Sequence, residues 1–202
     1  MKKWTAESLQ QFEARIADLF NQGKIYAPVH LSDGNESSLI EIFQAVKKED
    51  YVFCSWRSHY QCLLKGVDPE ILESEILAGR SIALCFPKLN IYSTAIVGGQ
   101  IPIATGAAYS IKRNKIESHV WCFVGDMTSE TGIAQTSFRY AEKYDLPITF
   151  IIEDNGISVL TETRKVWNTS TLRFEEQKNS KIISYQYKSR FPHAGAGTRV
   201  QF

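Results

Sequence analysis

The stretch that decides the fold runs from Trp121 to Val159 and reads WCFVGDMTSETGIAQTSFRYAEKYDLPITFIIEDNGISV. The apolar runs at 120–124 and 148–152 have the length and composition of buried strands. Residues 131–144, between them, predict a helix. A strand, a helix and a second strand of these lengths form a βαβ unit, so we expect a parallel sheet.

Polar side chains follow both strands of this unit. Asp126 comes directly after the first strand, and Asn155 follows the second, 29 positions later. Because the carboxyl ends of parallel strands meet at one edge of the sheet, where ligands bind, we expect these two side chains to lie side by side. Carboxylate and amide oxygens are hard ligands that suit Mg²⁺ or Ca²⁺ rather than zinc.

The same turn also suits a phosphate. Mg²⁺ is seldom held by protein ligands alone and usually takes phosphate oxygens as well. The N-terminus of the helix over 131–144 offers free N–H groups and a positive dipole end, and Thr128 and Ser129 add hydroxyl donors. These residues predict a metal-bridged diphosphate at a βα turn. The alternative is purely structural, with Asp126 as a helix cap and Asn155 in an ordinary turn.

The rest of the chain adds helices and strands around this unit. Asp68 and Pro69 mark a helix start, because aspartate caps a helix and proline fits its first position. The expected elements are helices over 6–22, 36–48, 69–79 and 98–112, strands over 51–54 and 181–187, and an irregular stretch over 80–97. No linker divides the chain, and its 202 residues suit one domain.

Composition excludes several classes of protein. With 23 Lys and Arg against 22 Asp and Glu, the net charge of +1 provides no strong field for nucleic acid or an anionic membrane. The four cysteines match no zinc spacing, and we expect them to be reduced. The basic start lacks an apolar signal region and no run reaches 18 apolar residues, so we expect a cytoplasmic protein without a membrane helix.

Several motifs together resemble one enzyme family. The run from Gly125-Asp126-Met127 to EDNGISV resembles the Gly-Asp-Gly…Asn signature of thiamine-diphosphate enzymes. Four further segments resemble, in family order, the alpha subunit of the decarboxylating component of 2-oxo acid dehydrogenases: FEARIADLFNQGKI, HLSDGNES, WRSHYQCLLKGVDPEILESEILAGR and AIVGGQIPIATGAAYSIK. The resemblance covers about residues 6–160. It implies an α/β thiamin-diphosphate-binding fold with a parallel sheet and helices on both faces.

The resemblance also implies a domain plan and two cofactors. The whole chain, 1–202, would be a single diphosphate-binding domain with N-terminal helices over 6–48 and an irregular tail over 188–202. The cofactors would be thiamine diphosphate and Mg²⁺. Asp126 and Asn155 would ligate the metal by their side chains, and Ile157 by its carbonyl.

Further residues match the family's cofactor and catalytic positions. The expected cofactor-binding positions, besides the metal ligands, are Trp56, Arg57, Ala95, Val97, Met127 and Thr128. His59 matches a family histidine near the reactive thiazolium, and His193 lies in a loosely matched later histidine region, RFPHAG. We expect His59 and His193 to be catalytic. His30, before LSDGNES, also matches a family position, and we expect it to be structural.

Two departures from the family pattern bear on function. Met127 stands where the signature has its second glycine, and its side chain would crowd the diphosphate unless it points away. The loop over 160–180 is shorter than the family's, which predicts a more open substrate pocket. The chain alone would hold half an active site.

The other half would come from a beta-type subunit that carries a pyrimidine-binding domain and the activating glutamate, by analogy in a heterotetramer. The substrate would be a 2-oxo acid or a ketose, cleaved at a carbon–carbon bond, and the acceptor a lipoyl domain. A transketolase-like carboligase of sugar metabolism is an alternative, with an aldehyde or sugar as acceptor. Another is a non-catalytic scaffold in which Met127 marks the loss of cofactor binding. A nicotinamide-binding domain is disfavoured, because no GxGxxG follows the first strand.

Overall fold

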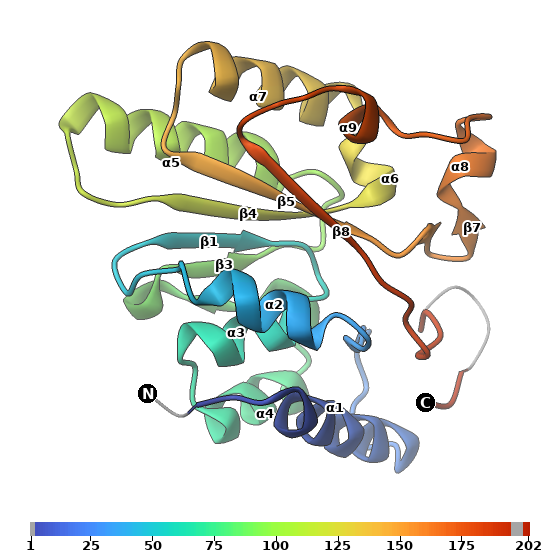
Figure 1. Ribbon diagram of the computed structural model, residues 1–202. Helices are drawn as coiled ribbons and strands as arrows, with labels where there is room; N and C mark the ends of the chain where they lie inside the picture. The colour runs from blue at the N-terminus through green and yellow to red at the C-terminus, as the bar shows by residue number, and fades with distance from the viewer. Residues whose placement is uncertain (1–2, 195–199) are drawn as a thin grey trace.

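A six-stranded sheet lies at the centre of the computed structural model, which describes residues 3–194 and 200–202 (Figure 1). In spatial order its strands are β2 (Cys85–Phe86), β3 (Ile91–Ser93), β1 (Tyr51–Cys54), β4 (Val120–Gly125), β5 (Ile148–Asp154) and β8 (Ile182–Gln186). Every neighbouring pair is parallel except β2 and β3. The predicted α/β fold with a parallel sheet is therefore confirmed.

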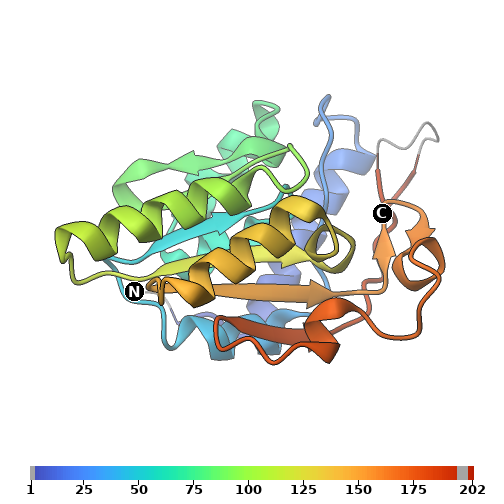
Figure 2. The same cartoon turned by 90° about the horizontal axis from the view of Figure 1, so that it is seen from above.

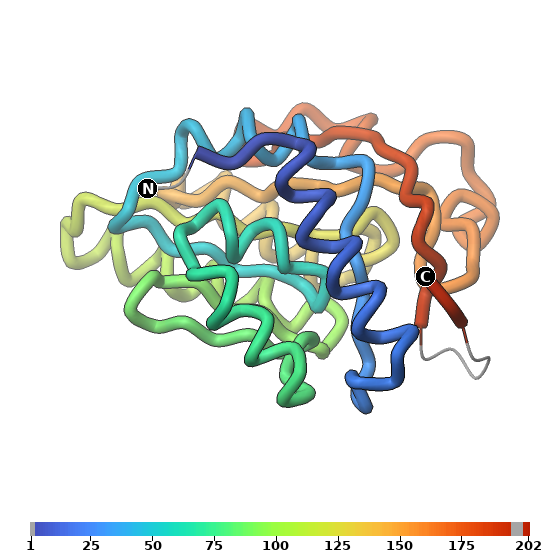
Figure 3. Tube along the Cα trace, turned by 90° about the horizontal axis from the view of Figure 1, so that it is seen from below, coloured from blue at the N-terminus to red at the C-terminus, as the bar shows by residue number. Residues whose placement is uncertain are grey.

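Helices cover both faces of this sheet, as predicted (Figures 1 and 2). One face carries α5 (Gln100–Asn114) and α7 (Gly132–Lys143). The other carries α1 (Ala6–Asn21), α2 (Glu36–Phe43), α3 (His59–Lys65) and α4 (Pro69–Leu77), which lie in front in the view from below (Figure 3). None of the helices among the described residues is long and apolar enough to cross a membrane.

The central strands supply both hydrophobic cores. Because successive side chains of a strand point to opposite faces, β4 sends Phe123 into the core with α1 to α4 and Val124 into the core with α5 and α7. β5 divides Ile151 and Ile152 in the same way. Strands buried on both faces need continuous apolar runs, and this is the pattern of VWCFV and ITFII.

The second predicted helix is shorter than expected. The pattern favoured a helix over 36–48, but α2 ends at Phe43. The Lys65 ammonium donates to the carbonyls of Lys47 and Lys48 at 2.6 and 3.1 Å. These carbonyls therefore bind a side chain from α3 instead of continuing a helical ladder.

The stretch over 80–97 is more regular than expected. It holds β2 and β3, together with two short 3₁₀ turns, Ser81–Ala83 and Pro87–Leu89. Strands of two and three residues are too short to show a period of two in sequence. Pairing with β1, with Val52 opposite Ile91, is what makes β3 a strand.

Small elements and an extended segment surround the end of β5. They are α6 (Asp126–Ser129), the hairpin of β6 (Ile157–Ser158) and β7 (Thr161–Glu162), α8 (Thr163–Val166) and α9 (Arg173–Glu176). After β8 the chain descends past the sheet toward α1 (Figure 1). Residues 195–199, with two glycines of the predicted irregular tail, lie outside the described residues. The backbone of Phe202 exchanges hydrogen bonds with the side chain of Asn21 at the end of α1.

Candidate active site

A cleft lies where β1, β4 and β5 end, at the right-hand side of the sheet in Figure 1. It brings together most of the residues predicted from the sequence. Those that line it are Trp56, Arg57, Asp126, Met127, Thr128, Asn155, Ile157 and His193. The remaining predicted residues, His59, Ala95 and Val97, are not part of its lining.

Strand register explains why residues so distant in sequence meet here. In the parallel pairing of β4 and β5, Gly125 lies opposite Glu153. The residues that follow, Asp126 and Asn155, therefore emerge from neighbouring strand ends at the same edge. β1 pairs with β4 on its other side and delivers Trp56 and Arg57 to this edge.

Asp126 carries a buried oxygen without a partner. The residue is only 2% exposed, and among the described residues neither its Oδ2 atom nor the nearby Thr163 hydroxyl accepts or donates a hydrogen bond. Burial raises the pKa of Asp126 to about 6; the nearby Thr163 hydroxyl dipole, which favours the carboxylate even without a formed hydrogen bond, opposes the shift, and the Asp154 carboxylate adds to it. A buried carboxylate oxygen left unpaired is costly, and a bound cation would satisfy it.

The other expected metal ligands fit a hard cation whose remaining coordination positions are filled by phosphate oxygens. Asn155 Oδ1 accepts the Ile157 N–H at 3.1 Å, and an amide oxygen has a second lone pair available. Within the described parts of the chain, no three or more His, Cys, Asp or Glu side chains are grouped to hold a metal. The donor set of one carboxylate, one amide and one carbonyl would thus suit Mg²⁺ only with a phosphate to complete it.

Arg57 is the cation best placed for that phosphate. Its Nη1 donates to the carbonyl of Leu31, which holds the guanidinium at the cleft, and among the described residues its other N–H groups have no hydrogen-bond partner and remain for a ligand. The guanidinium fork matches phosphate oxygens in pairs. Met127, the departure from the signature, also lines the cleft, from α6.

Ala95 and Val97 lie beside this site rather than in it. Both are exposed, on the loop that leads into α5. Gly98, next along this loop, is close to α6, because a Cβ added there would meet a methyl of Thr128 at 3.6 Å. The loop is therefore adjacent to the cleft, and Ala95 and Val97 face outward from the described chain.

His59 does not reach the cleft. Its side chain is fully buried beneath the sheet, with Nδ1 2.9 Å from Glu13 Oε2 and Nε2 2.8 Å from Ser81 Oγ. Glu13 Oε1 also accepts the backbone N–H of Ser32 at 2.8 Å. In this structure both ring nitrogens of His59 are engaged, one with Glu13 of α1 and the other with Ser81 of the first 3₁₀ turn.

At the cleft, His193 stacks on His30, which is not itself part of the lining and for which the sequence indicated only a structural role. The two rings stack with centroids 4.3 Å apart, and the Trp56 ring lies 5.9 Å from His30. His30 is 7% exposed and its Nδ1 atom has no partner within the described residues. Burial, then the charges of His193, Arg57 and His59, lower the pKa of His30 to about 3. The motif HLSDGNES marked the position of His30. Only the fold brings His30 against its stacking partner, which is 163 residues away in the sequence.

Glu153 is a second buried acid at the cleft that sequence reasoning missed. Its carboxylate accepts the Tyr185 hydroxyl at 2.6 Å and the Gln61 amide at 3.2 Å. Burial raises its pKa to about 7, and the hydrogen bond from Tyr185, followed by the charge of Arg57, opposes that shift. Nothing in the motif marked this residue, because its partners come from α3 and β8.

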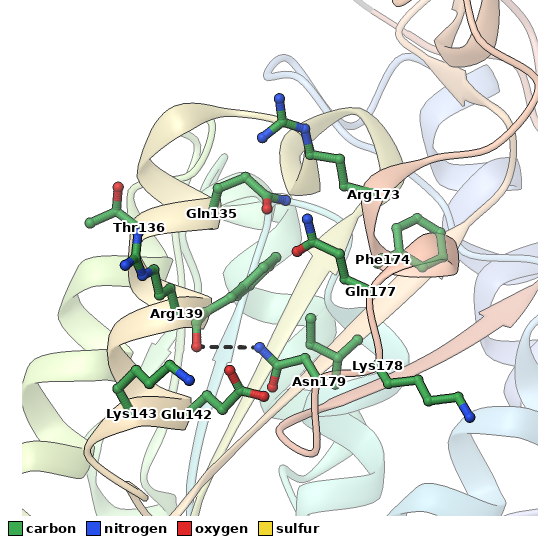
Figure 4. A pocket seen from close by; sticks show the side chains of 12 residues that line it. Gln135, Thr136, Arg139, Glu142, Lys143, Arg173, Phe174, Gln177, Lys178 and Asn179 are labelled. Atoms are coloured by element: carbon green, nitrogen blue, oxygen red, sulfur yellow. Dashed lines mark hydrogen bonds between the residues drawn. The ribbon is translucent and has the colours of Figure 1, made fainter.

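Another cavity, of about 440 Å³, lies between α7 and the segment 173–182 (Figure 4). Its labelled side chains are mostly polar or charged, and Asn179 donates to the Phe138 carbonyl at 3.4 Å. It shares no residue with the cleft. Most of the predicted site residues therefore lie at the cleft by the strand ends, and none of them lines this cavity.

Comparison with known proteins agrees with the geometry. The model of the dehydrogenase E1 component family matches residues 5–174. The alpha subunit of the pyruvate dehydrogenase E1 component of Rickettsia prowazekii is 30% identical over 167 residues, which is 78% of this chain and 51% of the relative. The alpha subunit of acetoin:2,6-dichlorophenolindophenol oxidoreductase of Bacillus subtilis is 27% identical over 164 residues, which is 76% of this chain and 49% of the relative.

The chloroplastic pyruvate dehydrogenase E1 component subunit alpha-3 of Arabidopsis thaliana is 29% identical over 180 residues, which is 78% of this chain and 42% of the relative. The chain thus spans about half the length of the curated relatives it matches. The resemblance to alpha subunits, expected from the motifs, is confirmed. The chain belongs to the dehydrogenase E1 component family.

Proposed function

We propose that this chain is the alpha-type, diphosphate-binding subunit of a thiamine-diphosphate-dependent enzyme. The enzyme cleaves a carbon–carbon bond beside the carbonyl of a 2-oxo acid or ketose and passes the acyl or ketol group to an acceptor. The observation that carries the proposal is the unsatisfied, buried Oδ2 of Asp126, in a cleft shared with Asn155 and Arg57. An oxygen donor without a partner beside a phosphate-binding cation fits a metal-bridged diphosphate.

Five residues of the cleft would hold the cofactor and its metal in this proposal. Asp126, Asn155 and the carbonyl of Ile157 would hold Mg²⁺, while Arg57 and the backbone at Thr128 would bind the diphosphate. Thiamine diphosphate, when bound, supplies the electron sink for bond cleavage. The chain's own contribution is to fix the diphosphate and to place polar groups at the mouth of the cleft.

The stacked histidines are the groups suited to moving a proton there. Burial lowers the pKa of both His30 and His193, so both rings are neutral near pH 7. A neutral imidazole can donate from one nitrogen and accept at the other. We assign to this pair the hydrogen bonding of substrate and the holding of a proton at a ring nitrogen.

A beta-type subunit is the partner in this proposal, and the resemblance assigns it the pyrimidine-binding domain and the activating glutamate. Large apolar side chains on the α5 side of the chain support a partner of this kind. Ile96 is 71% exposed, Val97 58% and Ile103 61%. Grouped apolar exposure of this kind marks protein interfaces.

The acceptor is either a lipoyl domain or, in a transketolase-like reaction, an aldehyde or sugar. A cavity of about 540 Å³ opens beside the cleft, between the β6–β7 hairpin and the segment after β8. It shares five residues with the cleft: Arg57, Asn155, Ile157, Val159 and His193. A cavity of this size supports a bulky acceptor. Product analysis with either acceptor supplied would choose between them.

Calorimetry on the chain co-expressed with its partner tests the cofactor assignment. Asp126→Ala should abolish Mg²⁺-dependent binding of thiamine diphosphate, because it removes the one carboxylate of the donor set. Asp18→Ala, on the exposed face of α1, is the matched control and should bind as the unmodified protein does. Unchanged affinity in Asp126→Ala would remove the metal assignment. Absence of binding in the unmodified complex would favour the scaffold alternative.

A further inference from the structure

The segment Tyr187–Ala194, here called the strap, crosses directly over the loop that carries His30. At the crossing, Gly34 has a φ of +83°, and a Cβ at this position would collide with the carbonyl oxygen of Lys188. Only glycine lets the two backbones pass so closely. The strap therefore has a defined seat on this loop.

An ion pair fixes the strap at that seat. Asp33, 2% exposed, accepts three hydrogen bonds from Arg190: from its backbone N–H at 3.0 Å, from Nε at 2.9 Å and from Nη2 at 2.6 Å. The Arg190 hydrogen bond holds the pKa of Asp33 below its usual range. The two-pronged guanidinium contact fixes direction as well as distance.

His193 depends on the strap for its position. His193 follows Arg190 by three residues in the sequence. Within the described residues its side chain makes no hydrogen bond or ion pair, and it contacts His30 by ring stacking. Phe191 and Phe202, with ring centroids 5.7 Å apart, are a second and apolar anchor of the strap. Of the two anchors, the Asp33–Arg190 ion pair is the directional one.

We infer that Arg190 is a positioning residue that, through Asp33, seats the strap on the His30 loop and so holds His193 stacked over His30 at the mouth of the cleft. The seat itself does not depend on any cofactor. Its value for catalysis rests on the function proposed above, in which the histidine pair serves the substrate. The Arg190 side chain is 78% exposed, so the pair adds little to global stability and acts mainly on local geometry.

The histidines provide the measurement, because the chain has only four of them. Imidazole NMR signals of the full chain, assigned by single substitutions, give the pKa of His30 in the absence of cofactor. In the unmodified chain His30 should stay neutral down to pH 5, since burial, His193, Arg57 and His59 all lower its pKa. Arg190→Gln should release the strap and expose His30, and its pKa should rise toward the ordinary value of 6.5.

Three variants make this test specific. Asp33→Asn should raise the pKa of His30 as much as Arg190→Gln does. The double variant should raise it no further than either single variant, because both substitutions remove the same interaction. In Arg190→Lys, which keeps the positive charge but loses the two-pronged guanidinium contact, the pKa of His30 should rise less. Arg139→Gln, an exposed arginine on α7, is the control and should leave His30 unchanged.

His119 reports whether the variants are folded. It lies at the start of β4, bonded to Thr149 Oγ1 at 2.9 Å and far along the sheet from the strap. If His119 is unchanged and His30 still resists protonation in Arg190→Gln and Asp33→Asn, the inference is wrong. Because no thiamine diphosphate is present, failure here is separate from failure of the calorimetric test of Asp126.

Discussion

Glu13 joins three separate parts of the molecule from one fully buried position. Its two carboxylate oxygens accept from the backbone of Ser32 and contact Nδ1 of His59, which in turn contacts Ser81. Buried polar groups in such a network are stabilising when all are satisfied and costly when one is removed. This residue-scale network holds the loop that carries His30 at Ser32, and the ion pair with Arg190 holds it at the next residue, Asp33.

We predict that Glu13→Ala lowers the free energy of unfolding by about 3 kcal/mol, because two buried partners lose their hydrogen bonds. Urea denaturation followed by circular dichroism measures this change. Gln10→Ala, on the exposed side of the same helix, should change stability by less than about 0.5 kcal/mol. Equal stability of the two variants would mean that water replaces the lost carboxylate and that Glu13 has no special role.

At the scale of elements, the β6–β7 hairpin is the strained part of the site. Val159 joins the two strands with a φ of +58°, a conformation that is unfavourable for a β-branched residue. It lines both the cleft and the cavity beside it, and neighbouring Leu160 is 68% exposed. Strain of this kind at a ligand-binding edge is retained only where the surrounding structure imposes it.

Val159→Gly should therefore raise the free energy of unfolding by about 1 kcal/mol, since glycine adopts this φ without strain. Val159→Ala keeps a Cβ atom and should raise the free energy of unfolding much less. Urea denaturation of both variants measures the difference. A glycine variant less stable than the alanine variant would indicate that Val159 side-chain packing outweighs backbone strain.

At the scale of the whole molecule, the chain presents two different faces. The helices α5 and α7 on one face expose four large apolar side chains, Ile103, Tyr109, Ile133 and Tyr140, whereas the helices α1 to α4 on the other face expose two, Ile71 and Leu77. A mainly apolar groove of about 340 Å³ runs between α5 and the strands β1 and β3 and includes Phe53, Tyr92 and Ile103. This asymmetry agrees with a partner that covers the α5 face.

We predict that Ile103→Asp weakens association with the beta-type subunit at least about tenfold, because a charge at a buried interface loses its hydration. Co-purification and analytical ultracentrifugation of the co-expressed pair measure the association. Ile71→Asp, 55% exposed on α4 across the sheet, is the matched control and should assemble normally. Equal assembly of both variants would place the interface elsewhere.

The sequence by itself determined the parallel βαβ unit and the meeting of Asp126 with Asn155. The reason is local: continuous apolar runs specify doubly buried strands, and parallel strands bring their following residues to one edge. The metal-ligand assignment remains a prediction from that pattern.

The tertiary structure decided what depends on contacts distant in sequence. It made β3 a strand through pairing with β1, and it ended α2 at Phe43 through the Lys65 ammonium. It turned His59 inward to Glu13 and stacked His193 on His30 instead. A histidine has the same motif neighbours in either environment, and only the packing of helices and of the strap decides whether its ring is buried beneath the sheet or placed at the cleft.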